Sequence, residues 1–245
     1  MIKIDNTYLG FSENLKNIND IYSSFKGELF FKDILEHVSV QFGLEYKQLI
    51  ETEFKRCIEE FADLIKINDS IGNPSKFTMD NLCISPSNLR YIYHSLLIES
   101  KIKRWFNKKE IKIVEIGGGY GGLCYYIKNI IKDYHINYTI VDLPNIINLQ
   151  SKFLNDVQVD SKLISCFDTT NINETFDLVI SNYCLSEISM ENRLYYLNNL
   201  VNKCEKEFYV WNSRSFEELN LNKYHIEDER PQTNYEQYNK YIFSI

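Results

Sequence analysis

From residue 109 onward, short apolar runs alternate with segments whose apolar residues recur every three or four positions. Such runs indicate buried strands, and the helical spacing indicates amphipathic helices between them. We predict strands at 111–116, 138–142, 161–165, 176–181 and 208–211, and helices at about 122–132, after Pro144 and after Ser189. Extended stretches around His225 and at 241–245 predict a closing antiparallel pair. The alternation predicts an α/β fold with a doubly wound, mostly parallel sheet.

The preceding residues, 1–108, show helical spacing and no convincing strand. Apolar stripes predict a helix at about 45–67 and another from Pro86 to about Phe106, with a polar loop between them at 70–86. We therefore divide the chain into a helical N-terminal region or lid, 1–108, and an α/β domain, 109–245.

Composition excludes several classes of protein. The net charge is −7 and no basic stripe is present, so we expect no nucleic-acid partner. The six cysteines are scattered without a C-x-x-C pair, which predicts reduced, mostly buried thiols rather than disulfides or a zinc site. No segment approaches the ~20 apolar residues that span a bilayer. We expect a cytoplasmic protein that does not insert into membranes.

A glycine-rich stretch follows the first predicted strand and carries the G-x-G-x-x-G spacing at Gly117, Gly119 and Gly122. Glycine lets the backbone approach a ligand closely, and the N-terminus of the next helix attracts anionic groups. Asp142 lies 20 residues beyond Gly122, so the spacing alone equally suits a dinucleotide-binding fold. Glu115, two residues before the first glycine, favours a different ligand. An acid repels a pyrophosphate and attracts an ammonium or sulfonium group.

Other polar residues follow the predicted strands and should meet at the same sheet edge, where ligands bind in such folds. Asp142 can accept hydrogen bonds from both ribose hydroxyls. Phe167 offers a ring to adenine, and Asp168 offers a carboxylate to its exocyclic amine. Asn182 and Tyr183 follow strand 176–181, where the reactive end of the ligand should lie.

Three segments together resemble class I S-adenosylmethionine-dependent methyltransferases, and in particular the sugar O-methyltransferases of bacterial surface-polysaccharide biosynthesis. They are Glu115-Ile-Gly-Gly-Gly-Tyr-Gly-Gly122, Val141-Asp-Leu-Pro144 and Phe176-Asp-Leu-Val-Ile-Ser-Asn-Tyr-Cys-Leu-Ser-Glu187. The segments Ser85–His94 and Glu229–Thr233 are also similar to that family, so the resemblance covers about residues 83–245.

The resemblance implies S-adenosylmethionine as cofactor and S-adenosylhomocysteine as product. The cofactor-binding residues would be Glu115, Gly117, Gly118, Gly119, Asp142, Leu143, Phe167, Asp168 and Asn182. Asn182 stands where metal-dependent catechol-type methyltransferases have an acid, so we predict no metal requirement.

Methyl transfer to a hydroxyl requires positioning and a general base. Our candidate base is Glu187, followed by His94 and, more weakly, His225. An acceptor pocket would use Tyr120 and Tyr183, with Arg90 and Arg230 able to hold an anionic group. The acceptor would be a small molecule: a sugar, a nucleotide sugar or a phosphorylated metabolite.

Three alternatives remain open at this point. The same fold could methylate a phosphate, a phosphoramidate or another small metabolite, none of which needs the same base. The bare glycine spacing also suits an NAD(P)-dependent oxidoreductase. A non-catalytic protein could retain the cofactor fold. No pattern in the chain predicts an oligomeric state.

Overall fold

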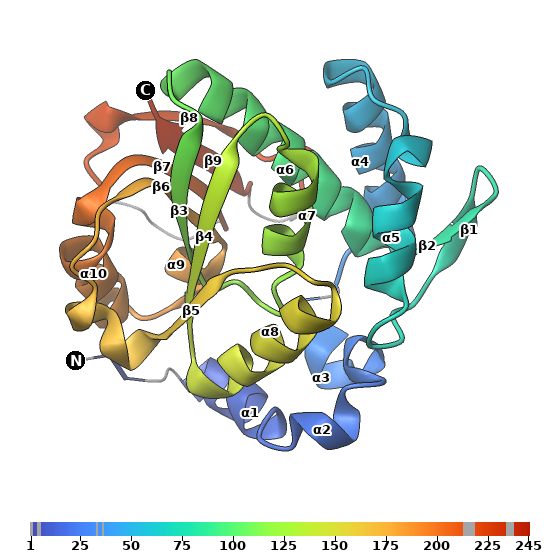
Figure 1. The fold of residues 1–245 in the computed structure, drawn as a ribbon, viewed down its shortest axis with the longest axis horizontal. Helices are drawn as coiled ribbons and strands as arrows, with labels where there is room; N and C mark the ends of the chain where they lie inside the picture. Colours follow the sequence, from blue (N-terminus) through green and yellow to red (C-terminus); the bar gives the residue numbers. More distant parts are fainter. Residues whose placement is uncertain (1, 4–5, 33, 36, 213–218, 234–237) are drawn as a thin grey trace.

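Seven strands form the central sheet of the computed structural model, which describes residues 2–3, 6–32, 34–35, 37–212, 219–233 and 238–245. The strand order is β5-β4-β3-β6-β7-β9-β8, and the first five strands in that row run parallel (Figure 1). These five are β3 (Glu110–Ile116), β4 (His135–Asp142), β5 (Lys162–Ser165), β6 (Phe176–Asn182) and β7 (Cys204–Trp211). The last two, β8 (Tyr224–Asp228) and β9 (Lys240–Ser244), pair antiparallel, and β9 also pairs antiparallel with β7. The predicted fold class and the predicted closing pair are confirmed.

Helices cover both faces of this sheet, because residues on each strand alternate between two apolar clusters. In β3, Ile111 and Ile113 belong to the cluster that contains α6 and α7, whereas Val114 and Ile116 belong to the cluster that contains α10. The helices of this part are α6 (Pro86–Trp105), α7 (Gly122–Ile130), α8 (Pro144–Asp156), α9 (Cys184–Glu187) and α10 (Met190–Asn199). Glu115 shares the alternation of Ile113 and so lies on the α7 side of the sheet.

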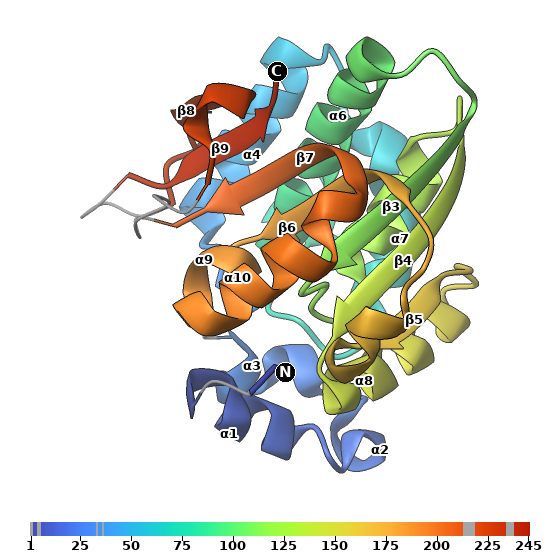
Figure 2. The same ribbon diagram turned by 90° about the vertical axis from the view of Figure 1, so that its left-hand side faces the viewer.

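The N-terminal residues form helices that pack against this core. They are α1 (Asn6–Asn14), α2 (Ile18–Ile21), α3 (Leu29–Lys32), α4 (Val40–Glu53) and α5 (Ala62–Asp69). Figure 2 shows α1 and α3 beside the end of the sheet toward which β4 points. One hydrophobic cluster includes Phe31, Tyr46 and Ile113, so it joins residues from both sides of the predicted boundary at 108.

Two predictions for this region were wrong. The predicted helix at 45–67 is interrupted, because Lys55 takes a positive φ of 56° and a 3-10 turn at Ile58–Phe61 precedes α5. The predicted loop at 70–86 contains a hairpin of β1 (Phe77–Met79) and β2 (Leu82–Ile84). Asp80 and Asn81, at its turn, both take positive φ, which Asp and Asn tolerate better than most residues.

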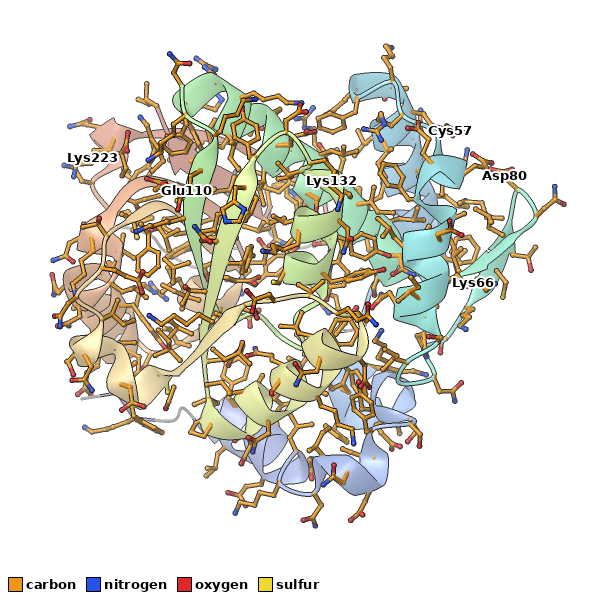
Figure 3. All side chains as sticks on the ribbon, in the orientation of Figure 1. Cys57, Lys66, Asp80, Glu110, Lys132 and Lys223 are labelled. Carbon is orange, nitrogen blue, oxygen red and sulfur yellow. The ribbon has the colours of Figure 1, made fainter. Side chains whose placement is uncertain are left out.

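Surface features agree in part with the compositional predictions. All six cysteines are free thiols, as predicted, but only Cys124 and Cys166 are buried, while Cys57 and Cys83 are exposed. Figure 3 shows Cys57 at the periphery of the molecule. No helix within the described ranges is long and apolar enough to cross a membrane. Short 3-10 turns also occur at Phe25–Gly27, Cys166–Asn171, Val201–Lys203 and Leu221–Lys223.

Candidate active site

A cavity of about 390 Å³ opens at the carboxyl ends of β3, β4 and β6. Ten of the sixteen residues predicted for the site line it: Arg90, Glu115, Gly117, Gly118, Gly119, Asp142, Leu143, Asn182, Tyr183 and Glu187. These ten come from α6, the glycine loop, the ends of three parallel strands and α9. The fold therefore gathers most of the predicted residues around one space, as expected for a doubly wound sheet.

The glycine loop forms one wall of the cavity, and its backbone explains the residue type. Gly117 and Gly119 take φ values of +77° and +57°, which side-chain-bearing residues rarely adopt. A Cβ at Gly117 would also collide with the side chain of Cys184. The N-cap of α7 is Gly121, which has no side chain, so the first amides of that helix receive no side-chain cap from it.

Two buried carboxyl groups face the cavity beside this loop. Glu115 is 2 % exposed and accepts a hydrogen bond from the Tyr138 hydroxyl at 3.1 Å. Burial, opposed by the Tyr138 hydrogen bond and assisted by the nearby Asp142 carboxyl, raises its pKa to about 8. The two acids thus favour a ligand that brings positive charge, because a cation stabilises their charged form.

Asp142 ends β4 and is held in place by the chain around it. It accepts hydrogen bonds from the Leu143 amide at 2.8 Å and from Gln150 Nε2 at 2.9 Å. Burial raises its pKa to about 7, and these hydrogen bonds oppose that rise. Each carboxylate oxygen has a second lone pair, so Asp142 keeps the capacity to accept hydrogen bonds from a ligand.

One end of the cavity is apolar. Its residues are Leu143, Ile146, Cys166, Ile188 and Tyr196. Sequence reasoning placed the adenine contacts one residue further, at Phe167 and Asp168. Neither of these two lines the cavity, and Phe167 is 44 % exposed on the 3-10 turn that begins at Cys166.

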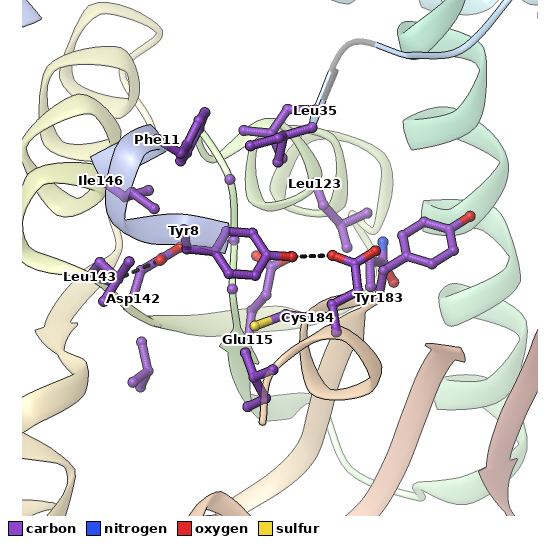
Figure 4. A pocket seen from close by; sticks show the side chains of 18 of the residues that line it. Tyr8, Phe11, Leu35, Glu115, Leu123, Asp142, Leu143, Ile146, Tyr183 and Cys184 are labelled. Carbon is purple, nitrogen blue, oxygen red and sulfur yellow. Dashed lines mark hydrogen bonds between the residues drawn. The ribbon is translucent and has the colours of Figure 1, made fainter. Parts of the chain in front are cut away.

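Glu187 follows β6 on the short helix α9, and two side chains from elsewhere in the chain position its carboxylate. Tyr8 of α1 donates a hydrogen bond to Glu187, and Asn212 Nδ2 donates one at 3.2 Å. Figure 4 shows the Tyr8 ring reaching across the cavity from the Asp142 side toward Tyr183. Tyr8 and Asn212 also line the cavity, and neither was found from the sequence, because no local motif links them to Glu187, which lies 179 positions from Tyr8 and 25 positions from Asn212.

The N-terminal segment closes one side of the cavity by docking on both neighbouring helices. The Lys3 amide donates to Asn192 Oδ1 at 3.1 Å, and Asn192 Nδ2 donates to the Lys3 carbonyl at 2.6 Å. On the other wall, Asn145 Nδ2 donates to the Ser12 carbonyl at 2.9 Å. Ile2 and Phe11 complete this cover with apolar side chains.

The acceptor-side residues form a second polar wall. Arg90 donates to the Leu35 carbonyl at 2.9 Å and lies 3.3 Å from His37 Nε2. Burial and the charge of Arg90 lower the pKa of His37 to about 4, so its imidazole is neutral at pH 7. Tyr183 takes a positive φ of 64°, and its hydroxyl donates to Glu229.

Three of the remaining predicted residues lie away from the cavity. Tyr120 is fully buried in the core, where its hydroxyl lies 3.2 Å from Asn68 Nδ2. Arg230 forms an ion pair with Glu53 at 2.6 Å, at the surface. His225 lies 3.6 Å from Glu227 on β8 and is more than half exposed.

His94 is completely buried and also does not line the cavity. Burial, with a smaller contribution from the charge of Arg90, lowers the pKa of its imidazole to about 3. Its ring nitrogens lie 3.2 Å from Asn182 Nδ2 and 3.4 Å from the Tyr241 hydroxyl. This placement suits a residue that orients Asn182 better than one that takes a proton from a substrate.

Within the part of the chain that the structure describes, no group of three or more His, Cys, Asp or Glu side chains is arranged to hold a metal ion. The absence of a metal requirement stays a prediction.

Comparison with known proteins gives the fold. No family model matches the chain, and no curated protein matches it in sequence.

A structure reported as a class I S-adenosylmethionine-dependent methyltransferase from Listeria monocytogenes is 12 % identical over 98 % of this chain and 88 % of its own, with a TM-score of 0.54. A plantazolicin methyltransferase in complex with S-adenosylhomocysteine is 13 % identical over 83 % of this chain and 96 % of its own, with a TM-score of 0.47. A methyltransferase from Aquifex aeolicus is 13 % identical over 60 % and 87 %, with a TM-score of 0.44. The chain has the fold of the class I methyltransferases, as its likeness to the Listeria structure establishes.

Proposed function

We propose that this chain is an S-adenosylmethionine-dependent methyltransferase that transfers a methyl group to a hydroxyl of a sugar or nucleotide-activated sugar. The observation that carries the proposal is the pair of buried acids, Glu115 and Asp142, beside the glycine loop of a methyltransferase fold. The resemblance of the motifs to sugar O-methyltransferases supports the acceptor class and a place in surface-polysaccharide biosynthesis. The six free thiols suit a reducing compartment, and we propose a cytoplasmic location.

The residues present fit this cofactor. Glu115 would hold the ammonium end, because an unpaired buried acid is stabilised by a cation. Asp142 would accept hydrogen bonds from the ribose, and the apolar end with Leu143 and Cys166 would hold the adenine. When bound, the cofactor supplies a methyl group on a positively charged sulfur.

The chain's own residues would do the rest of the catalytic work. Glu187 would accept the proton of the acceptor hydroxyl, with its carboxylate oriented by Tyr8 and Asn212. The N-terminal segment would exclude water by covering the cavity. Positioning the acceptor in line with the methyl group would supply most of the remaining rate enhancement.

One observation favours a second acceptor class within the same fold. Arg90 lines the cavity, and a guanidinium suits a phosphate or carboxylate. A phosphorylated metabolite is therefore the second candidate. An NAD(P)-dependent oxidoreductase is disfavoured, because Glu115 would face a pyrophosphate in the buried site.

Calorimetry with S-adenosylhomocysteine and with NAD tests the cofactor, and a screen with labelled S-adenosylmethionine tests the acceptor. We expect binding of S-adenosylhomocysteine and none of NAD. Binding of NAD alone would overturn the proposal. Labelled methyl groups should reach activated sugars; transfer only to phosphorylated metabolites would favour the second candidate.

A further inference from the structure

Two residues that line the cavity each have a buried carboxamide oxygen without a hydrogen-bond partner. Six buried side-chain oxygens lack a partner among the described residues, and only those of Asn182 and Asn239 belong to residues that line the cavity. Buried polar atoms in native proteins are almost always satisfied, so an unpaired one at a binding cavity calls for an explanation. Both side chains come from the same side of the sheet, at the end of β6 and just before β9.

The orientation of the Asn182 amide follows from a chain of hydrogen bonds behind it. The Tyr241 hydroxyl donates to the Arg230 carbonyl at 2.9 Å, so it can only accept from His94 Nε2, 3.4 Å away. With its proton on Nε2, neutral His94 offers a lone pair at Nδ1, which accepts from Asn182 Nδ2 at 3.2 Å. The amino side of the amide therefore faces His94, and Oδ1 is left as an acceptor.

The Asn239 amide is fixed in the same way by a separate set of partners. Its Nδ2 donates to Glu229 Oε2 and to Thr233 Oγ1, each at 3.0 Å. Its backbone amide donates to Gln232 Oε1 at 2.8 Å, and the Glu229 amide donates to its carbonyl at 2.9 Å. With both ends held and only 4 % of the residue exposed, the oxygen of Asn239 has no protein donor to turn toward.

We propose that Asn182 Oδ1 and Asn239 Oδ1 accept hydrogen bonds from hydroxyl groups of the methyl acceptor, and that His94 is a positioning residue for Asn182. This inference rests on the proposed methyltransferase function. It assigns Asn182 to the acceptor, whereas the sequence placed it with the cofactor. The two amides are specificity-determining residues, because a carboxamide oxygen accepts from a hydroxyl and repels an oxyanion.

The strand order separates the two ligands. The cofactor-binding candidates Glu115 and Asp142 stand on β3 and β4, whereas the two amides belong to β6 and to the chain entering β9. A methyl group passing from one ligand to the other crosses the cavity near the end of β6. Glu187, the proposed base, follows that same strand, so base and amides serve one acceptor hydroxyl and its neighbours.

The test measures S-adenosylhomocysteine binding by calorimetry, thermal stability, and transfer of labelled methyl groups to a defined set of probes. The probes are methyl glycosides of hexoses and UDP-hexoses, with sugar phosphates and inorganic phosphate as oxyanion probes. We expect Asn182→Ala and Asn239→Ala each to raise KM for the best hydroxyl probe by about tenfold while the Kd of S-adenosylhomocysteine changes by less than about threefold. Ser95→Ala is the matched control, because its hydroxyl is also buried and unpaired but does not line the cavity.

Two variants of His94 test its role in positioning Asn182. His94→Asn keeps an acceptor atom near Nδ1 and should keep KM close to that of the wild type. His94→Phe removes both nitrogens and should raise KM as Asn182→Ala does, with the same Kd for the cofactor product. If His94→Phe does not fold, the comparison of His94→Asn with Asn182→Ala decides the point.

Each outcome has one meaning. Failure of the wild-type protein to bind S-adenosylhomocysteine overturns the proposed function and this inference with it. Normal product binding with methylation of oxyanion probes only, or of none of the hydroxyl probes, overturns the inference together with the hydroxyl acceptor of the proposed function, while cofactor binding stands. Unchanged KM in both alanine variants, or loss of S-adenosylhomocysteine binding in them, likewise removes the amides from the acceptor site.

Discussion

Replacing Glu115 with Gln should make the cofactor-free protein more stable and the cofactor bind more weakly. The substitution keeps the size of the side chain and an oxygen that can accept from Tyr138, but removes the ionisable group. The ordinary pKa of a glutamate is 4.5, and burial raises that of Glu115 to about 8. The folded protein therefore holds a proton at neutral pH that the unfolded chain releases.

The sign of the pH dependence follows from this difference. Between the unfolded and folded pKa values the native state binds more protons, so the free energy of unfolding falls as pH rises. The interval from 4.5 to pH 7 corresponds to at most about 3 kcal/mol. Because Glu115 lines a cavity that solvent can enter, we expect about 1–3 kcal/mol, or roughly 3–9 °C in Tm for a chain of this length.

The assay is thermal unfolding of the wild type and Glu115→Gln from pH 5 to pH 8. The Tm difference should be small at pH 5 and grow as pH rises, because the unfolded wild-type chain ionises Glu115 while the native state keeps it protonated. Glu110→Gln, on the exposed start of the same strand, is the control and should show no such growth. In parallel, Glu115→Gln should weaken S-adenosylhomocysteine by about 1.5–3 kcal/mol, through loss of a charge-assisted hydrogen bond. A Tm difference that does not depend on pH, or an unchanged dissociation constant, would refute the reasoning.

Three other substitutions test the remaining parts of the site. Asp142→Ala should weaken S-adenosylhomocysteine by roughly 1.5–3 kcal/mol in calorimetry, and an unchanged value would place the ribose elsewhere. Glu187→Gln should lower kcat on a hydroxyl acceptor by about 10²-fold or more, with product binding unchanged; a rate within a few fold of wild type would remove Glu187 as the base. Tyr8→Phe removes a contact between the N-terminal cover and Glu187 and should speed release of S-adenosylhomocysteine by about tenfold in stopped-flow measurements. Tyr22→Phe, which loses a hydrogen bond to Asp156 outside the cavity, is its control, and equal release rates would show that the contact does not hold the cover closed.

The strands of the sheet, and the residues that line the cavity at the ends of β3 and β4, could be predicted from the sequence because each is marked by a local pattern. A run such as 111–116 carries its own alternation, and Glu115 and Gly117 stand in one continuous motif that ends that strand. Asp142 closes the next strand in the same way. Since parallel strands bring their carboxyl ends to one edge, local strand predictions were enough to bring these residues together.

The errors in the N-terminal region have a different physical origin. The apolar stripe at 45–67 continues through Lys55, but the backbone there takes a positive φ that the stripe does not encode. The short strands at 77–79 and 82–84 are too brief for their own alternation to stand out, and they depend on a turn at Asp80 and Asn81. In both places one or two backbone conformations decide the structure, and hydrophobic periodicity is insensitive to them.

Tyr8 and the role of His94 could not be found from the sequence, because each depends on a distant partner. His94 had been a candidate base on residue type alone, yet its burial and its neighbours Asn182 and Tyr241 are properties of the packed fold. Tyr8 reaches Glu187 across 179 positions of sequence. These contacts depend on how the N-terminal segment and the C-terminal strands fold back over the sheet.

This division has a consequence for how such a protein changes function. The glycine loop and the two acids belong to the strands that hold the sheet together, so altering them would disturb the fold as well as the proposed cofactor site. Asn239 belongs to the connection before β9, and Tyr8 to a helix docked on the rim of the cavity. Side chains on such segments can be exchanged with little change to the sheet beneath them. If Asn182 and Asn239 read the acceptor, exchange of Asn239 should change which hydroxyl is methylated while the Kd of the cofactor product stays the same.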